Sequence, residues 1–507
     1  MKLSVPNVAI LPSPGIGHLN PLLEFARHIV AVHGVSATLF VISTGASPRQ
    51  RELLADPTLP PALRIVELPD LDVSSALPPG ARAQTRISVI VRESLPDLRA
   101  ALFGLTARPA ALVVDLFGTD AFDVADELRV PKYLYFTTSA WLLAQMMHLP
   151  ALDRLVRGEF AELREGVVVP GCNPILPRDL VDPLLHREDE AYSWFLHHAG
   201  RFSEARGILV NTWEGLEPAA LAALRREPAL VGIPTPRVFP VGPLTKPADG
   251  ADPRYGCLTW LDAQPPKSVL FVAFGSRGTL SVEQTTELAL GLEQSGQRFL
   301  WAARRPTEGK SEALGAYLPA VGEEDDVQGD YLPQGFRERT REKGLVVSSW
   351  APQPAVLSHP AVGAFLTHAG WNSTMEGVVA CVPMIAWPLY AEQRMNATML
   401  SQDLGVAVRV RPRGADGTYP AAAAGLVVGR EEVERVVRLV MEGEEGKAMR
   451  ERVGELHRDA YRSLEEGGAS RRALAEVVDG WRNGMREGLK QPADARWTGS
   501  YMISSMS

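Results

Sequence analysis

Cysteine is scarce in this sequence. Only Cys172, Cys257 and Cys381 occur among 507 residues, far apart and without a CxxC pair. This pattern argues against a disulfide framework and a thiolate metal site, and it indicates a reducing compartment, so we expect a cytoplasmic protein. No apolar run reaches the roughly 20 residues that a transmembrane helix needs. The opening MKLSVPNVAILPSP lacks the apolar core of a signal peptide, and we expect none.

An excess of basic residues is also missing. The chain has 52 Lys and Arg against 60 Asp and Glu, a formal net charge of -8. It therefore lacks the basic surface typical of proteins that bind nucleic acid or anionic membranes. Hydrophobic residues at 46% and charged residues at 22% are ordinary for a soluble enzyme. The length exceeds what one hydrophobic core usually serves, so we expect two domains in a monomer.

Short apolar runs alternate with helix-length segments in two series, which predicts an α/β fold with two parallel sheets. The first series comprises residues 8–11, 37–42, 64–68, 111–114, 133–136, 208–212 and 238–241. The second comprises residues 268–274, 299–303, 345–350, 362–368, 383–388 and 405–410.

The composition between these runs indicates the domain limits. We expect an N-terminal domain at 1–243, a linker rich in Pro, Gly and Asp at 244–256, and a C-terminal domain at 257–470. A terminal helix at 471–490 is expected to pack back on the N-terminal domain, and a tail follows at 491–507. Residues 170–183 predict a surface loop over the first domain's cleft. Residues 306–332 and 412–425 predict further loops.

A polar block follows the expected strand at 362–368. His368, Gly370, Trp371, Asn372 and Ser373 form a strand-to-helix turn at a strand's carboxyl end, where open α/β sheets bind ligands. Free backbone N–H groups at a helix start suit a phosphate. The block therefore predicts a ligand that carries a diphosphate.

A second candidate site lies in the first series of strands. His18 is expected in the loop after the first strand, and Asp115 at the end of ALVVD, two strands along in the same sheet. A neutral imidazole accepts a proton near neutral pH, and a carboxylate can orient it. Taken alone, His18 is more often a surface or capping residue, and Asp115 could cap a helix, although Asp120 suits that task better. Asn20 and Pro21 predict the start of the first helix.

The stretch from Trp350 to Gln393 resembles the signature box of plant secondary-product glycosyltransferases, the family 1 UDP-glycosyltransferases. The match comprises WAPQ, HP, FLTH, GWNS, Glu376, Pro383 and the terminal EQ. Ala369 and Cys381 depart from the family pattern, which usually has Cys and Gly there. A cysteine is unfavourable at the second position if that turn needs a positive φ. The resemblance implies the GT-B fold, in which two Rossmann-like domains face each other across a cleft. The acceptor would bind in the N-terminal domain and the nucleotide sugar in the C-terminal domain.

The resemblance also implies roles for individual residues. His18 and Asp115 would form the catalytic dyad. The implied UDP-sugar-binding residues are Ser276, Trp350, Gln353, His368, Trp371, Asn372, Ser373, Glu376, Glu392 and Gln393. The Trp350 indole can stack on uracil and the Glu376 carboxylate can accept ribose hydroxyls. Glutamine at the last position implies glucose. Arg277 stands where the family usually has glycine, and its role stays open.

The expected function is that of an inverting UDP-glucose-dependent O-glucosyltransferase that makes β-glucosides. Stretches such as VVDLFGTDAFDVADEL and WPLYAEQRMNA are similar to those of hydroquinone and monolignol glucosyltransferases, which implies small phenolic acceptors. Leu116, Phe117 and Trp141 would line the acceptor pocket. Flavonoids, xenobiotic phenols and anilines stay open as acceptors.

Other functions fit the sequence less well. A catalytically silent nucleotide-sugar-binding protein stays open, but it would not need His18 and Asp115. A dinucleotide-dependent oxidoreductase would need a GxGxxG loop after a strand, and FGSRG and GIGHLN do not supply one. No cofactor is expected beyond the co-substrate UDP-glucose. A metal is not expected either, because the Asp70 and Asp72 pair is short and remote in sequence from the phosphate site.

Overall fold

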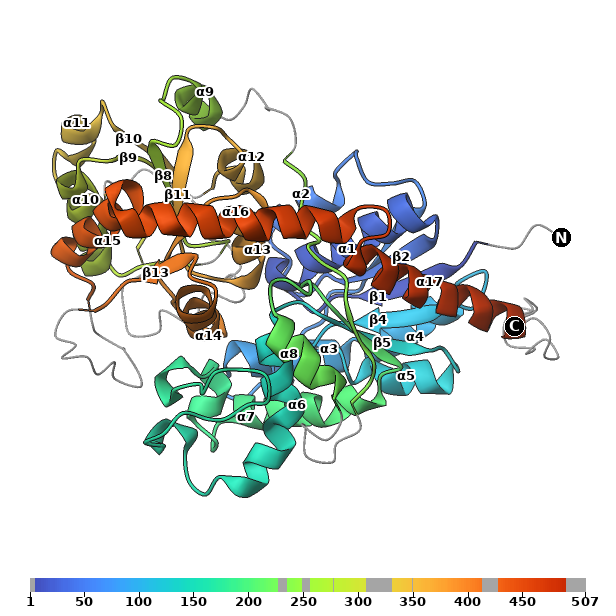
Figure 1. The fold of residues 1–507 in the computed structure, drawn as a ribbon. Coiled ribbons are helices and arrows are strands. Elements are labelled where there is room, and N and C mark those ends of the chain that lie inside the picture. The colour runs from blue at the N-terminus through green and yellow to red at the C-terminus, as the bar shows by residue number, and fades with distance from the viewer. Residues whose placement is uncertain are drawn as a thin grey trace.

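The computed structural model describes residues 5–226, 235–248, 256–276, 278–306, 331–348, 350–412 and 427–488. Two parallel sheets, each with helices packed against it, lie beside each other in this part of the chain (Figure 1). Part of the predicted linker (249–255), Arg277, most of the two predicted loops (307–330 and 413–426) and the predicted tail lie outside the described residues.

The N-terminal domain is built on seven parallel strands in the order β3-β2-β1-β4-β5-β6-β7. These are β1 (Asn7–Leu11), β2 (Ser36–Ile42), β3 (Leu63–Leu68), β4 (Ala111–Val114), β5 (Lys132–Phe136), β6 (Gly207–Val210) and β7 (Val238–Pro240). Its helices are α1 (Ile16–His33), α2 (Pro48–Leu54), α3 (Ala83–Glu93), α4 (Leu95–Phe103), α5 (Ala121–Glu127), α6 (Ala140–Leu155), α7 (Glu190–Arg201) and α8 (Pro218–Arg225). The central strand β4 is wholly buried and apolar, as expected for a parallel strand covered on both faces.

The C-terminal domain repeats this design with six parallel strands in the order β10-β9-β8-β11-β12-β13. These are β8 (Val269–Ala273), β9 (Arg298–Ala303), β10 (Gly344–Ser348), β11 (Val362–Thr367), β12 (Met384–Ala386) and β13 (Ala407–Arg409). Its helices are α9 (Gly256–Asp262), α10 (Val282–Ser295), α11 (Phe336–Thr340), α12 (Gln353–Leu357), α13 (Trp371–Val379) and α14 (Gln393–Thr398), which continues into a π-helical turn, η7 (Met399–Asp403). Every predicted strand is present, with ends that differ by at most two residues.

Each sheet reverses its winding direction between two neighbouring strands, β1 and β4 in the first and β8 and β11 in the second. At such a switch point the flanking connections diverge and leave a crevice at the carboxyl ends of the strands. His18 and Asp115 follow β1 and β4, while Ser276 and His368 follow β8 and β11. The prediction that Asp115 lies two strands from His18 was wrong, because β4 pairs directly with β1 and chain order does not give sheet order.

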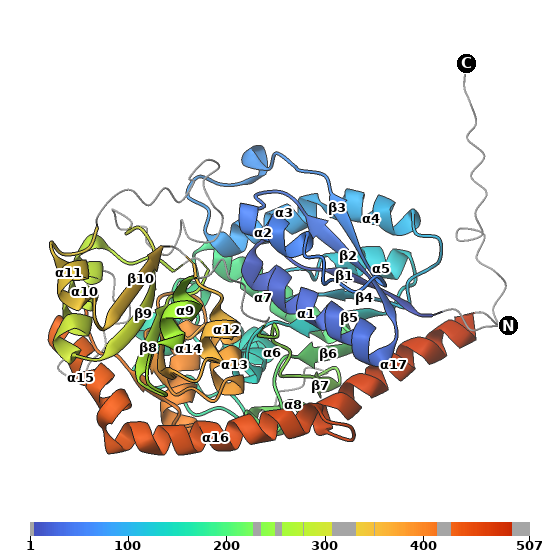
Figure 2. The same cartoon turned by 90° about the horizontal axis from the view of Figure 1, so that it is seen from above.

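Three helices end the part of the chain that the structure describes: α15 (Arg430–Glu442), α16 (Glu444–Leu464) and α17 (Ala469–Gly488). Figures 1 and 2 show α16 along the C-terminal domain and α17 continuing onto the N-terminal domain. Leu474, Val477, Val478 and Trp481 of α17 join the hydrophobic cluster of the first sheet. Trp481 packs edge-on against Tyr133 of β5 with ring centroids 5.8 Å apart. None of the described helices has the length and apolarity that a bilayer crossing requires.

Helix α1 begins earlier than the sequence predicts. Its first residue is Ile16, and Pro21 lies inside it, so the prediction of a start at Asn20 and Pro21 was wrong. Gly15 has a φ of 106°, which lets the chain enter the helix within a few residues of β1. A proline inside a helix leaves the carbonyl four residues earlier without its N–H donor. That carbonyl belongs to Gly17, and the Asn372 amide of the C-terminal domain approaches it at 3.5 Å. His18 therefore stands in the first helical turn and not in a loop.

Both departures from the family pattern lie in left-handed backbone. Ala369 has a φ of 61° and Cys381 a φ of 59°. A residue with a Cβ pays about 1–2 kcal/mol for this conformation. The cysteine therefore occupies a turn whose geometry favours the glycine that the family usually has there.

Replacing Cys381 with glycine should raise the free energy of unfolding by up to about 1 kcal/mol. The strain of about 1–2 kcal/mol disappears, while the greater freedom of glycine in the unfolded chain costs about 0.4–1 kcal/mol. Cys257→Gly is the matched control, because Cys257 is buried in α9 and glycine costs about 1 kcal/mol in a helix. Urea unfolding measures both variants. A Cys381→Gly variant as destabilised as the control would contradict the strain.

Candidate active site

His18 and Asp115 form a buried pair at the switch point of the first sheet. The Nδ1 atom of His18 lies 3.1 Å from Oδ2 of Asp115, and the side chains are 7% and 0% exposed. The aspartate therefore holds Nδ1, and Nε2 is the ring nitrogen that would exchange a proton with a ligand. This is the arrangement of an oriented general base.

The sequence analysis missed a residue that holds Asp115. Ser13 donates its backbone N–H to Oδ2 at 3.0 Å, and its hydroxyl donates to Oδ1. The backbone N–H of Phe117 also donates to Oδ1, at 3.1 Å. Burial alone would raise the pKa of Asp115, but His18 and the Ser13 hydrogen bonds hold it below its usual range. Ser13 lies two residues beyond β1, at the same sheet edge as His18, and this position was the available signal.

The predicted acceptor residues are buried on the same side of the sheet. Leu116, Phe117 and Trp141 are 5%, 4% and 4% exposed. The Phe117 ring meets the His18 ring edge-on with centroids 5.4 Å apart and also packs against Phe195 of α7 at 5.9 Å. The surroundings of His18 are thus aromatic and apolar on the Phe117 side.

Trp141 lies in the first turn of α6, which a buried carboxylate anchors. Glu217 accepts the backbone N–H groups of Ala140 at 2.9 Å and of Trp141 at 3.0 Å. Burial raises the pKa of Glu217 to about 7, while these hydrogen bonds and one from Thr212 oppose the rise. The carboxylate therefore fixes where α6 begins.

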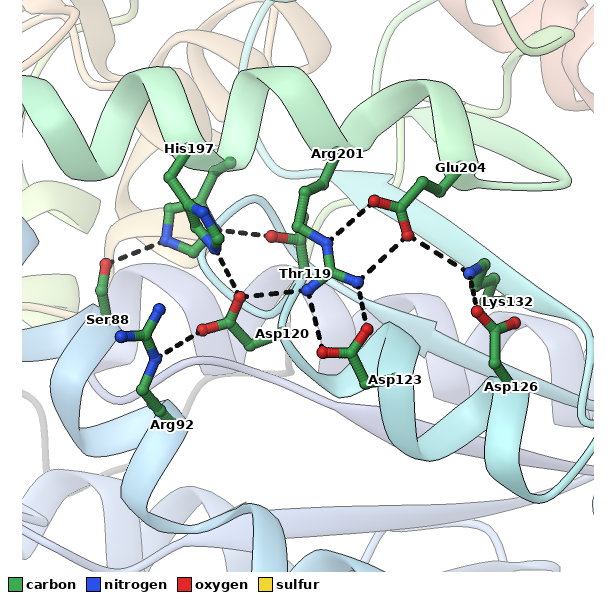
Figure 3. Close-up of polar contacts among 11 residues, drawn as sticks. Ser88, Arg92, Thr119, Asp120, Asp123, Asp126, Lys132, His197, Arg201 and Glu204 are labelled. Carbon is green, nitrogen blue, oxygen red and sulfur yellow. Dashed lines mark hydrogen bonds and ion pairs between the residues drawn. The ribbon is translucent and has the colours of Figure 1, made fainter.

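A polar cluster ties α7 to α3 and α5 behind Phe117 (Figure 3). Asp120 binds Arg92 at 2.9 Å, His197 at 2.6 Å and Arg201 at 3.3 Å. Asp120 stands at the N-cap position of α5 as predicted, but its side chain makes no capping hydrogen bond, because it binds these three side chains instead. The cluster fixes the helix that carries Phe195.

His198 forms the buried end of this cluster. Its Nε2 lies 3.0 Å from the hydroxyl of Ser88 and its Nδ1 lies 2.7 Å from that of Thr119. Burial lowers the pKa of His198 to about 3, with His197 adding to the effect and Asp120 opposing it. The ring is therefore neutral at ordinary pH.

The donor half of the site is the start of α13 at the second switch point. His368 directly follows β11, and its ring packs so closely on Gly275 and Gly370 that a Cβ on either glycine would lie 2.5 Å from it. Burial, reinforced by Arg304, lowers the pKa of His368 to about 4. The Trp371 N–H at the helix start is bound by the Glu392 carboxylate, while the neutral imidazole and the N–H groups of Asn372 and Ser373 offer donors to an anion. Ser276, on the turn after β8, is exposed near this point.

Three predicted residues form one hydrogen-bonded group. The Gln353 amide donates to the Ser373 hydroxyl at 2.9 Å and to the Glu376 carboxylate at 2.7 Å. Burial raises the pKa of Glu376 to about 7; Glu24 of α1 adds to the rise and the Gln353 hydrogen bond opposes it. Glu376 also lines a cavity of about 590 Å³ between the domains, with Glu24, Arg27 and Lys246 among the other lining residues.

The Trp350 indole contacts the Arg49 side chain of the N-terminal domain. The guanidinium carbon of Arg49, on α2, lies 4.1 Å from the centroid of the indole, which is cation–π geometry. The N-terminal domain therefore reaches the side chain that was predicted to stack on a base.

Glu392 and Gln393 begin α14, beyond β12. The side-chain oxygen of Gln393 accepts the N–H groups of Leu389 at 2.9 Å and Tyr390 at 3.0 Å. Burial raises the pKa of Glu392, against hydrogen bonds from its own N–H and that of Trp371. Its carboxylate thus lies at the start of α13 and within electrostatic reach of His18.

Trp371 contributes more to the domain interface than its prediction suggested. The indole is 2% exposed and donates to the backbone carbonyl of Asn211, just beyond β6, at 2.9 Å. Asn211 also holds the start of the linker through two hydrogen bonds with Leu244. Asn396 of α14 makes a second connection, since its Oδ1 accepts from Ser139 at 3.3 Å and its Nδ2 donates to Ala369 at 3.0 Å. No local sequence pattern pointed to these contacts.

No group of three or more His, Cys, Asp or Glu side chains comes together as a metal site within the described residues. Asp72 of the weighed Asp-x-Asp string instead accepts the backbone N–H of Ser74 at 2.9 Å in an exposed turn. All three cysteines, each in the described part, are free thiols.

Comparison with known proteins places this geometry in context. A family model described as UDP-glucoronosyl and UDP-glucosyl transferase matches residues 248–421. UDP-glycosyltransferase 72B1 of Arabidopsis thaliana is 47% identical, with 95% of this chain and 97% of that protein covered. Hydroquinone glucosyltransferase of Rauvolfia serpentina is 44% identical, with 94% and 98% covered. The structure of Phytolacca americana UGT2 complexed with UDP-2fluoro-glucose and pterostilbene is 44% identical, has a TM-score of 0.82, and matches over 94% of this chain and 100% of that one.

His198 should make the fold acid-sensitive. Below pH 6.5 the unfolded chain protonates this histidine and the folded chain does not, so stability is lost as pH falls from 6.5 towards 3. Between pH 6 and 4.5 this amounts to about 2 kcal/mol, from roughly 1.4 kcal/mol per pH unit. The variant His198→Gln lacks this titrating imidazole. The contributions of the other histidines are the same in both proteins and cancel when the two are compared. Urea unfolding at several pH values should show wild type losing stability faster than the variant, and parallel curves would contradict the account.

Proposed function

The chain belongs to the plant family 1 UDP-glycosyltransferases, and from that membership we propose an inverting glucosyltransferase that transfers glucose from UDP-glucose to small phenols. One observation carries the proposal. The His18 and Asp115 pair lies at the switch point of one sheet, and the anion-suited start of α13 at that of the other, with Glu392 between them within reach of His18. The products would be β-glucosides.

The chemistry needs no covalent intermediate. The phenol oxygen gives its proton to Nε2 of His18 and attacks the anomeric carbon of UDP-α-glucose. The new C–O bond forms as the bond to the diphosphate breaks on the opposite face, and UDP leaves with the electron pair. Asp115 stabilises the imidazolium while it lasts. Displacement from the opposite face inverts the anomeric configuration.

Residues of the C-terminal domain would hold the donor. Trp350 stacks on the uracil, Gln353 bonds near the base and ribose, and Glu376 accepts the ribose hydroxyls. The diphosphate would lie against His368, Asn372, Ser373 and Ser276 at the start of α13, where N–H groups and the helix dipole favour negative charge. Glu392 and the NH₂ group of Gln393 would hold glucose hydroxyls. The proposal includes no metal and no cofactor.

The printed names of two similar proteins support small phenols as acceptors. One relative is named as a hydroquinone glucosyltransferase, and the similar Phytolacca structure contains pterostilbene, a phenol. The Phe117 ring against His18 supplies an apolar wall for such a ring, with Leu116 and Trp141 as further lining residues. Apolar walls discriminate weakly between similar rings, so flavonols and anilines belong in any test. A catalytically silent binding protein would not require the buried pair.

Replacing His18 with alanine should lower glucosyl transfer by about 10²–10⁴-fold, the usual contribution of a general base. UDP binding should change by less than about twofold, because the donor site lies on the other domain. Mass spectrometry of products from UDP-glucose and a pool of hydroquinone, a monolignol, a flavonol and an aniline measures transfer, and wild type should favour the first two. Exposed His186→Ala is the control. A His18→Ala variant with near-normal turnover would end the base assignment.

Affinity for UDP-glucose should rise as pH increases from 6 to 8. Glu376 loses its proton near pH 7 in the free protein, and a carboxylate accepts ribose hydroxyls better than the acid does. The diphosphate diester of UDP-glucose lacks the phosphate ionisation near pH 6 that would confuse the comparison. Calorimetry at each pH should give a flatter dependence for Glu376→Gln. Equal pH dependence in the two proteins would remove Glu376 from this role.

A further inference from the structure

The loop between α6 and α7 crosses from the N-terminal domain to the C-terminal domain. Its residues 170–183 were predicted to lie over the first domain's cleft, and the loop contains three 3-10 turns: η2 (Phe160–Glu162), η3 (Pro177–Asp179) and η4 (Asp182–Leu185). Two of its carboxylates bind arginines of the other domain: Asp179 pairs with Arg409 of β13 at 2.6 Å, and Asp182 pairs with Arg394 of α14. Both are ion pairs between the domains, but one reaches strand β13 and the other reaches helix α14.

Asp182 binds the turn that carries the predicted sugar ligands. Its Oδ2 accepts the backbone N–H of Ala391 at 2.5 Å, while its Oδ1 takes the guanidinium of Arg394. These two partners flank Glu392 and Gln393 in the chain. One carboxylate therefore holds both ends of the four-residue turn.

The backbone of this turn needs such support. Ala391 has a φ of 54°, and an alanine pays about 1–2 kcal/mol for left-handed backbone. Hydrogen bonds from the N–H groups of Leu389 and Tyr390 to the Gln393 side chain fix the turn to the residues just before it. They do not fix its position relative to the domain that carries His18. Asp182 connects the turn itself to that domain, whereas the hydrogen bond between Ser139 and Asn396 connects α14 farther along the helix.

We propose that Asp182 is a positioning residue, which sets the sugar-binding turn against the catalytic histidine and thereby tunes recognition of the transferred sugar. The inference rests on the proposed function. It assigns sugar recognition partly to a residue of the acceptor domain. The uridine diphosphate part lies on α12, α13 and Trp350, none of which Asp182 touches through a described hydrogen bond or ion pair, so recognition of that part stays unchanged.

Asp179 offers a matched control. It sits on the same loop, three residues earlier, and its ion pair also joins the domains. Its partner Arg409 lies in β13 and not in the sugar-binding turn. Any effect of general domain attachment should therefore appear in Asp179→Asn as well as in Asp182→Asn, whereas an effect on the sugar should appear only in the second.

The experiment measures the dissociation constants of UDP and UDP-glucose by calorimetry, and kcat/KM with UDP-glucose and UDP-galactose. Asp182→Asn should weaken UDP-glucose binding by about tenfold, as expected for one charged hydrogen bond, with UDP binding changed by less than about twofold. Its preference for glucose over galactose should shift by at least about threefold. Arg394→Gln, which breaks the same pair from the other side, should act in the same direction. Asp179→Asn should leave both ratios unchanged.

Three results would overturn the proposal: unchanged UDP-glucose binding in Asp182→Asn, equal losses in Asp182→Asn and Asp179→Asn, or equal weakening of UDP and UDP-glucose. Normal UDP binding shows in the first two cases that the variant is folded, and in the third a urea-unfolding midpoint equal to that of wild type shows it. A wild-type protein that binds UDP but neither binds nor transfers glucose would instead refute the proposed function. The two failures are thus distinguishable.

Discussion

The site depends on holding two sheet edges opposite each other, because neither sheet contains a complete set of groups. The His18 and Asp115 side chains lie at the switch point of one sheet, and the start of α13 lies at the switch point of the other. The buried hydrogen bond from Trp371 to the carbonyl of Asn211 joins these edges directly. A buried donor left without its acceptor costs about 1–3 kcal/mol, so this contact favours a fixed approach of the two domains. Helix α17, which follows α16, also joins the domains, because its apolar side chains pack into a hydrophobic cluster of the first sheet.

Burial sets the charge of the site before any ligand arrives. The pKa of His368 falls to about 4 and that of Glu376 rises to about 7, so both are drawn towards their neutral forms near pH 7. Asp115 is the exception, because hydrogen bonds from Ser13 and the neighbouring imidazole favour its charged form. The site therefore keeps its fixed negative charge on the base side. On the proposed donor side, backbone N–H groups would bind the diphosphate, and no charged side chain would first have to be neutralised.

Local pattern sufficed for the strands and failed for contacts between distant segments. The apolar runs that became β4 and β11 are buried along their whole length, and such runs identify parallel strands directly. The start of α1 was misplaced because Pro21 looks like a first-turn residue, and only the fold shows it inside the helix. Trp371 and Asn211 are 160 positions apart, and Asp182 and Ala391 are 209 apart. Nothing in a single sequence links such distant pairs. The roles implied for the stretch from Trp350 to Gln393, by contrast, came from the order and spacing of its residues.

The central claim is that the two halves act on one reaction centre between the domains. A crystal structure with UDP-2-fluoro-glucose and a small phenol tests it most directly. The account predicts the uracil on Trp350, the diphosphate at the start of α13, and the phenol oxygen within about 3 Å of Nε2 of His18, facing the anomeric carbon. A phenol bound with its oxygen away from His18, or a nucleotide bound elsewhere than the start of α13, would contradict it.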